Sequence, residues 1–181
     1  MQFQFNVSLS ENDYYEYNKF LMLRSYYGKK RINTMRSIIT VICALVVVLM
    51  LLEYGSTFTA FIGAMPMIIL FILFQLLLKP YYILLLKLSL KKLNKSEKKR
   101  YSPTSVIEFS DECFIETTPE TKSEQKYGTI ERISVVDNKV IYLHFNNFMA
   151  IILPVSCFET QEQYSEFLEF IKSKCANIDI Y

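Results

Sequence analysis

The first residues of the chain alternate strictly between apolar and polar side chains. This period of two predicts a half-buried strand over residues 2–9, with apolar members Phe3, Phe5, Val7 and Leu9. A single amphipathic strand is not stable in water and must pair with another strand. We therefore expect it to join a sheet that forms later in the chain.

An amphipathic helix is predicted to follow the strand. Ser10 with Asp13 three residues later is typical of a helix start, and Gly28 is expected at the helix end. The apolar stripe of this helix consists of Tyr14, Tyr17 and Leu21. Strand and helix together form an N-terminal segment of residues 1–35.

Two long uncharged stretches come next, at residues 37–52 and 57–78. A helix rises ~1.5 Å per residue, so the second stretch can cross a hydrocarbon core of ~30 Å, whereas the first needs its flanking turn. We expect a transmembrane hairpin over residues 36–79, with spans at about 36–53 and 57–78. A hairpin buried in a soluble core is the alternative, but no other part of the chain could cover so much apolar surface.

Small residues occur in the second predicted span. Ala60 and Ala64 have the small-xxx-small spacing of a helix contact, with Gly63 beside them and Pro66 two residues further on. These four residues are candidates for a hinge, or for helix-packing positions that contact a second copy or a partner. The alternative is that a tight hairpin needs small side chains and tolerates proline.

Beyond Pro80 the sequence predicts a separate basic amphipathic helix over residues 80–100. One face is apolar and the other carries lysines, a pattern typical of contact with an anionic lipid surface. The candidate contacts are Lys87, Lys91, Lys92, Lys95 and Lys98. Nucleic-acid binding is not expected, because this segment adjoins the bilayer and lacks stacking aromatic residues.

Charge is distributed unevenly along the chain. The 181 residues have a net charge of +2, but residues 1–100 carry 14 basic and 5 acidic side chains, whereas residues 101–181 carry 6 and 13. Basic residues flank both predicted spans and are absent from residues 53–56, which places both termini in the cytoplasm. A cleavable signal peptide is not expected, because the first twenty residues are polar. We therefore expect a multi-pass protein of the cell membrane.

From residue 101 the pattern changes to short strands and turns. Strands are predicted over residues 104–109, 113–117, 123–127, 130–136, 139–145 and 148–153. Tight turns are expected at Asp137–Asn138 and Asn146–Asn147, and Thr160 with Gln163 is a capping box that starts a final helix. The expected fold class is α+β: a two-helix transmembrane hairpin and an antiparallel β domain of residues 101–181, closed by a C-terminal helix.

Three short segments resemble the YcxB-like family of small bacterial membrane proteins. They are Phe109-Ser110-Asp111-Glu112, Lys126-Tyr127-Gly128-Thr129-Ile130, and Ile152-Leu153-Pro154 running to Phe158. The order of strand, helix, hairpin and β-rich part resembles the family over nearly the whole chain, although Cys157 departs from the alanine expected there. The resemblance implies a PH-like cytosolic domain and implies no reaction.

Few residues of the chain suggest catalysis or ligand binding. The four glycines are isolated, so there is no phosphate-binding loop, and the four cysteines have neither pairing nor metal-ligand spacing. The only histidine, His144, shares a strand face with Val140 and Tyr142, which favours a structural or exposed position. Turn chemistry accounts for the adjacent carboxylates Asp111 and Glu112. No cofactor and no metal is expected.

These patterns favour an integral membrane protein that presents a PH-like cytosolic domain for protein interaction or regulation and is not an enzyme. The expected partners are the lipid bilayer and an unidentified protein, with a second copy of the chain as a further candidate and no nucleic acid. Two alternatives stay open. One is an accessory subunit of a membrane transporter, and the other is a membrane-tethered enzyme that would use His144, Asp111 and Glu112.

Overall fold

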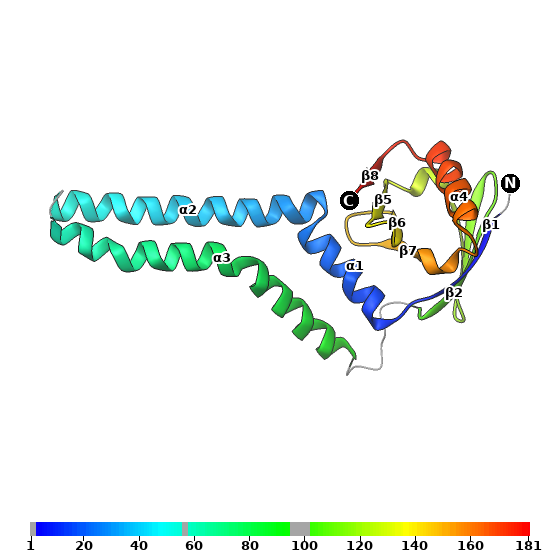
Figure 1. Cartoon of the computed structure of the whole chain (residues 1–181), viewed down its shortest axis with the longest axis horizontal. Helices are drawn as coiled ribbons and strands as arrows, with labels where there is room; N and C mark the ends of the chain where they lie inside the picture. The colour runs from blue at the N-terminus through cyan, green and yellow to red at the C-terminus, as the bar shows by residue number, and fades with distance from the viewer. Residues whose placement is uncertain (1–2, 56–57, 95–101) are drawn as a thin grey trace. The chain divides into compact units, whose positions relative to one another are not determined.

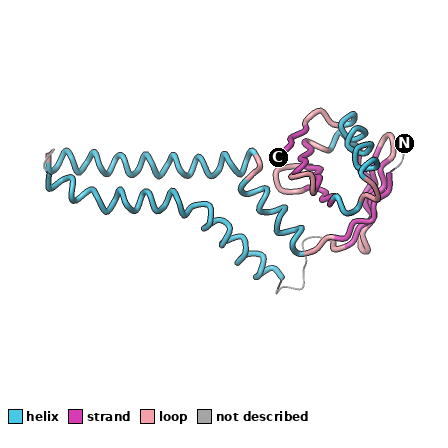
Figure 2. Tube along the Cα trace, viewed as in Figure 1, coloured by secondary structure: helices cyan, strands magenta, loops and turns pink. Residues whose placement is uncertain are grey.

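The computed structural model describes residues 3–55, 58–94 and 102–181. The fold is α+β and divides into two compact units (Figure 1). The β unit comprises Met1–Asn18 and Lys92–Tyr181, and the helical unit comprises Lys19–Lys91. Figure 2 shows that the described strands belong to one of these units and the two longest helices to the other.

The first sheet of the β unit contains the N-terminal strand. Its order is β1 (Phe3–Ser8), β2 (Thr104–Phe109), β3 (Cys113–Thr117) and β4 (Lys122–Lys126), with every neighbouring pair antiparallel. β1 lies along β2 with Phe3 opposite Phe109 and Ser8 opposite Thr104. The pairing expected for the N-terminal strand is therefore present, and the helical unit is inserted in the chain between two neighbouring strands of one sheet.

The second sheet has the order β7 (Ala150–Pro154), β6 (Val140–His144), β5 (Arg132–Val136) and β8 (Ile178–Ile180). β5, β6 and β7 pair antiparallel, whereas β8 runs parallel to β5. Asp137 and Asn138 both have a φ of 51°, the left-handed conformation that a two-residue hairpin turn requires. The turn predicted at these residues is confirmed, whereas β8 and the division into two sheets were not predicted.

Short helices modify the strand ends that the sequence predicts. The strand expected at residues 123–127 ends at Lys126, because the 3₁₀ helix η1 (Tyr127–Thr129) begins there, and η2 (Val155–Cys157) follows β7 directly. α4 (Gln161–Lys174) starts at the expected capping box, in which the Gln163 backbone N–H donates to Thr160 Oγ1 at 3.1 Å.

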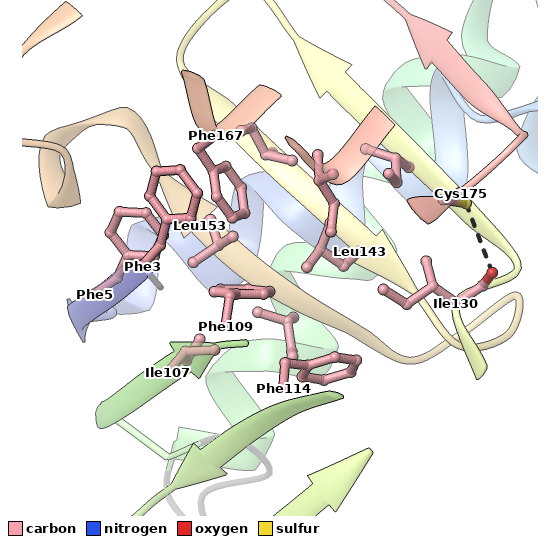
Figure 3. Packing of buried hydrophobic residues seen from close by; sticks show 14 of the residues in the cluster. Phe3, Phe5, Ile107, Phe109, Phe114, Ile130, Leu143, Leu153, Phe167 and Cys175 are labelled. Atoms are coloured by element: carbon pink, nitrogen blue, oxygen red, sulfur yellow. Dashed lines mark hydrogen bonds between the residues drawn. The ribbon is translucent and has the colours of Figure 1, made fainter. Parts of the chain in front are cut away.

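The hydrophobic core of the β unit lies between the two sheets and α4 (Figure 3). Phe167 of α4 is fully buried, and its ring centroid lies 5.0 Å from that of Phe5 and 4.9 Å from that of Phe109. These rings come from α4, β1 and β2, so the N-terminal strand supplies side chains to the core as well as backbone pairing. At one side of the core the Cys175 thiol donates to the Ile130 carbonyl oxygen at 3.7 Å.

The helical unit is built from α2 (Tyr26–Tyr54) and α3 (Phe58–Asn94), which Figure 1 shows running side by side. α1 (Glu11–Leu23) begins in the β unit and ends in the helical unit. It ends five residues before Gly28, so the expected helix end at that glycine is corrected. The separate helix expected after Pro80 is also corrected, because α3 continues through Pro80 to Asn94. Proline removes one backbone donor and bends a long helix without ending it when the turns on both sides persist.

Candidate functional site

The surfaces of α2 and α3 are apolar and exposed. The stretches Tyr26–Glu53 and Ile62–Lys92 are long and apolar enough to cross a membrane. In their most apolar parts none of the α2 residues and 11% of the α3 residues are buried, whereas a helix in a soluble core is mostly buried. Leu52 is 77% exposed and Leu76 is 69% exposed. Exposed apolar surfaces of this extent are typical of contact with a membrane or with another protein.

A small polar cluster joins α2 to α3 within the helical unit. Arg36 Nη2 donates to the Gln75 carbonyl oxygen at 3.3 Å, and the Gln75 side-chain amide donates to Thr40 Oγ1 at 3.4 Å. The Thr40 hydroxyl in turn donates to the Arg36 carbonyl oxygen at 2.8 Å. Hydrogen bonds between helices set their register, so this cluster fixes which turns of the two helices lie opposite each other.

The corner between α1 and α2 is built on Ser25 and Gly28. The Ser25 hydroxyl donates to the Leu21 carbonyl oxygen at 2.6 Å and accepts from the Gly28 backbone N–H at 3.1 Å, so it caps α2 and ties it to the last turn of α1. A Cβ atom at Gly28 would lie 2.5 Å from the Met22 carbonyl oxygen and closer still to that of Leu21. Glycine is therefore needed at position 28 for a close backbone approach.

The predicted lipid-contact residues of α3 have exposed side chains where the structure describes them. Lys87, Lys91 and Lys92 are exposed, whereas Lys95 and Lys98 lie outside the described residues. On α2 an open hollow of about 500 Å³ has a polar and basic lining of Tyr26, Lys29, Lys30, Asn33, Thr34 and Ser37, with Ile38 as its apolar member. Basic side chains thus line the ends of both helices that lie away from residues 53–58.

The four predicted helix-packing residues lie near the start of α3. Ala64 is 7% exposed, whereas Gly63 and Pro66 are exposed, and the side chain of Ala60 lies outside the described residues. A Cβ atom added at Gly63 would meet no atom within 4 Å. In the described part of the chain, Gly63 therefore borders open space rather than a close helix contact.

The predicted structural or exposed position of His144 proves to be a buried one, on the face of β5 and β6 opposite the core. His144 is 1% exposed and Ser134 is fully buried, with His144 Nε2 3.1 Å from Ser134 Oγ. Tyr17 of α1 covers this face, since its ring centroid lies 5.0 Å from that of Tyr142 and 6.3 Å from that of His144. We call Tyr17, Ser134, Tyr142 and His144 the aromatic layer.

Burial sets the protonation of the aromatic layer. Loss of solvent, with a smaller effect of the Arg132 charge, lowers the pKa of His144 to about 4, so the imidazole is neutral at pH 7. Burial, with a smaller effect of Tyr142, raises the pKa of Tyr17 well above its usual range. A serine hydroxyl beside a neutral imidazole is the arrangement of an activated nucleophile, but such a pair must also meet a substrate. Here neither side chain of the pair touches solvent, so the geometry stabilises strand pairing.

The turn that carries Asp111 and Glu112 is held by backbone contacts. Ser110 Oγ donates to the Cys113 carbonyl oxygen at 2.7 Å, and the Tyr127 hydroxyl donates to the Ser110 carbonyl oxygen at 2.6 Å. Asp111 and Glu112 are exposed at the tip of this turn. This turn joins β2 to β3 of the first sheet, whereas His144 lies on β6 of the second sheet. The structure therefore does not bring the three catalytic candidates into one described site.

Potential nucleophiles and metal ligands are scattered over the described residues. No group of three histidine, cysteine or acidic side chains there could hold a metal ion. Burial raises the pKa of the Cys157 thiol to about 11, so this cysteine is protonated at neutral pH and is a poor nucleophile. Among the described residues, the large exposed apolar side chains thus lie mainly on α2 and α3, and few of them lie on the β unit.

Comparison with known families identifies the β-rich part of the chain. Residues 109–171 match the model of the YcxB-like protein family. This stretch of the chain is thus similar to that family. The match runs from the end of β2 to α4 and includes the segments around Tyr127 and Leu153. No curated protein and no solved structure matches the chain. The YcxB-like match begins after α3, and the two apolar helices therefore lie outside the matched residues.

Proposed function

We propose that the chain is an integral membrane protein of the cell membrane, with α2 and α3 crossing the bilayer as a hairpin. The exposed apolar surface of both helices carries this proposal. A hydrocarbon core of ~30 Å needs about 20 helical residues, and both stretches exceed that length. Arg36 lies one residue before the uncharged stretch, and its hydrogen bond to the Gln75 carbonyl oxygen partly neutralises the cost of a charge at the edge of that stretch.

The proposed orientation places both termini in the cytoplasm. Lys29, Lys30 and Arg31 precede the apolar part of α2, and Lys79, Lys87 and Lys91 follow that of α3. The intervening tip at Gly55 has no basic neighbour among residues 53–56. Because loops rich in lysine and arginine stay on the cytoplasmic side, the basic ends of the hairpin favour that side.

Reporter fusions test this topology directly. A reporter that is active only outside the cytoplasm, inserted at Gly55, should be active, and the same reporter after Tyr181 should be inactive. Both fusions should remain in the membrane fraction after carbonate extraction. An active reporter at the C-terminal position, or release of the protein by carbonate, would overturn the proposal.

In this proposal the β unit is a PH-like cytosolic domain that serves protein interaction or regulation and performs no catalysis. Two mainly antiparallel sheets, with β8 as the one parallel strand among those described, and the C-terminal helix α4 support the PH-like assignment, together with the YcxB-like match. The net charge of −7 over residues 101–181 disfavours an anionic membrane and favours a basic protein surface as partner. The buried His144–Ser134 pair argues against an enzyme.

Purification in mild detergent with a cross-linker tests this assignment. A soluble basic protein should be recovered with the full chain, and it should not be recovered when the cross-linking itself is carried out in 0.5 M salt, because salt screens contacts between exposed charges. A variant with His144→Gln, Asp111→Asn and Glu112→Gln should recover the same partner. Loss of a turnover reaction in that variant would favour the membrane-tethered enzyme instead.

Lipid contact by the lysines of α3 is a separate part of the proposal. Lys87, Lys91 and Lys92 are exposed, and each basic residue near an anionic surface contributes about 1 kcal/mol of attraction. Replacing these three by glutamine should reduce the number of anionic lipids that copurify with the protein. Replacement of the exposed residues Lys122, Lys126 and Lys139 of the β unit is the matched control and should leave that number unchanged.

One observation favours the second candidate, an accessory subunit of a transporter. Gly63 is exposed on α3 with open space where a Cβ atom would lie, so a partner helix could approach closely there. In that case Gly63→Leu should abolish recovery of a larger membrane protein, whereas Ile72→Phe, on the opposite face of α3, should not. Equal recovery with both variants would exclude this contact.

A further inference from the structure

The loop between β6 and β7 displays two adjacent apolar side chains. Phe148 is 82% exposed and Met149 is 62% exposed. In the described part of the β unit, Ile180 is the one other large apolar residue with comparable exposure, and it lies at the end of β8. The sequence pattern predicts a strand over residues 148–153, but β7 begins at Ala150, so both side chains lie outside the sheet.

This loop is held in one conformation by polar contacts. Asn146 Oδ1 accepts from the backbone N–H groups of Phe148 and Met149, each at 2.8 Å, and the Phe145 N–H donates to the Met149 carbonyl oxygen at 3.0 Å. The Tyr17 hydroxyl of α1 donates to the Phe148 carbonyl oxygen at 3.2 Å. The loop backbone is therefore fixed while its two apolar side chains point away from the core. A fixed loop loses little conformational entropy when those side chains bind a surface.

We propose that Phe148 and Met149 insert into the interfacial region of the bilayer that holds α2 and α3. This inference rests on the proposed membrane insertion of those helices. Tyr17, which holds the loop, precedes Ser37, where the uncharged stretch of α2 begins, by twenty residues. All of these residues except Arg24 and Ser25 are helical, so at ~1.5 Å per helical residue the connection is on the order of 30 Å or less. The loop therefore has a bilayer within reach whenever α2 is inserted.

The chemistry of the loop fits an apolar surface better than a charged one. Residues 145–158 contain no charged side chain. Two apolar side chains give weak binding for a free protein, but a covalent tether raises the effective concentration of the membrane and makes such a contact persistent. The net charge of −7 over residues 101–181 opposes an anionic surface, so a zwitterionic bilayer isolates the apolar contribution.

Tryptophan fluorescence tests this insertion, because the chain has no tryptophan of its own. The full chain with Phe148→Trp is placed in phosphatidylcholine nanodiscs at one chain per disc. Its emission should be blue-shifted, and lipids brominated on the upper acyl chain should quench it at least twofold. The matched control is Ile180→Trp, which replaces another highly exposed apolar residue of the β unit and should keep a water-like, unquenched emission.

A third variant separates failure of this inference from failure of the membrane assignment. Phe74→Trp lies within the apolar part of α3, so its quenching reports insertion of the hairpin. Quenching at position 74 with water-like emission at position 148 would overturn the loop insertion and leave the membrane assignment intact. Absence of quenching at position 74 would overturn both.

Other occupants of the loop give distinct outcomes. A blue shift at position 148 that requires two chains per disc would identify a second copy as the occupant, and one that requires added soluble protein would identify a protein partner. Either result overturns the lipid contact. With Phe148→Trp, the further change Met149→Asp should reduce quenching at least twofold, and unchanged quenching would show that the two side chains do not insert together.

Discussion

His144 Nε2 lies 3.1 Å from Ser134 Oγ, and the two residues join β6 to β5 on the face that Tyr17 covers. His144 is 1% exposed, so the structure keeps a titratable ring in an environment that resists its protonation. The free energy of unfolding of the β unit at acidic pH should therefore depend on the protonation of His144.

Acidification should therefore destabilise the β unit. The pKa of His144 is about 4 in the folded chain and 6.5 when unfolded, so the unfolded state takes up the proton first as pH falls. This residue contributes about 3 kcal/mol to the free energy of unfolding. The contribution is fully present above pH 6.5 and is lost as the pH falls from 6.5 to 4. Urea denaturation of the full chain in nanodiscs, followed by pulse proteolysis of the β unit, measures this loss.

The control for this prediction is His144→Gln, which keeps a hydrogen-bonding group beside Ser134 but does not titrate. This variant should show a smaller decrease in the free energy of unfolding between pH 6.5 and pH 4. An identical decrease in both proteins would mean that carboxylates, and not His144, control acid stability.

The backbone contact at Gly28 predicts a second, conformation-specific effect. In Gly28→Ala the new Cβ atom would overlap the carbonyl oxygens of the last turn of α1, so the corner must open at a cost of about 1–3 kcal/mol. Hydrogen exchange at the Gly28 amide, which donates to Ser25 Oγ, should increase. The paired variant is Gly63→Ala, where the Cβ atom meets open space and alanine should stabilise the helix by up to about 1 kcal/mol. Equal effects at the two glycines would contradict the close approach.

Local patterns in the sequence predicted much of the β unit. The alternation through Phe5 predicted β1, and Asp137–Asn138 predicted a turn that needs two positive φ angles. The capping pairs at Ser10 and Thr160 are present as hydrogen bonds. Each of these features depends on residues that are near neighbours in the chain, so a single sequence contains the whole signal.

Features that depend on distant residues were not predicted. β8 has three residues and pairs in parallel with β5, more than forty residues earlier, so no local period reveals it. The burial of His144 depends on α1 covering a second face of the sheet. A signal was available, because the strand of Tyr142 is apolar on both faces, which is typical of a sheet covered on both sides. The sequence at Phe148 has the apolar pattern of a strand. It forms a loop instead, because the Asn146 side chain accepts hydrogen bonds from the backbone N–H groups of Phe148 and Met149.

Two buried tyrosines with different hydrogen bonding allow a matched comparison. The Tyr127 hydroxyl donates to the Ser110 carbonyl oxygen at 2.6 Å, whereas the Tyr164 hydroxyl has no hydrogen-bond partner among the described residues. Tyr127→Phe should lower the free energy of unfolding by about 1 kcal/mol, because a net hydrogen bond is lost. Tyr164→Phe should be neutral or stabilising, because it removes a desolvated hydroxyl. Urea denaturation of both variants measures the difference, and an equal loss in both would contradict these assignments.

The N-terminal strand β1 pairs with β2, although the whole helical unit separates the two strands in sequence. Phe5 is 1% exposed and its ring centroid lies 4.6 Å from that of Phe158, whereas its neighbour Asn6 is exposed. Phe5→Ala should therefore cost about 3–5 kcal/mol of β-unit stability, and Asn6→Ala should change it by less than about 0.5 kcal/mol. Deletion of residues 2–9 should make the β unit protease-sensitive, because both the edge pairing with β2 and this aromatic packing are lost. Unchanged protease resistance in the deletion, together with equal effects of the two alanine variants, would show that β1 is not part of this core in solution.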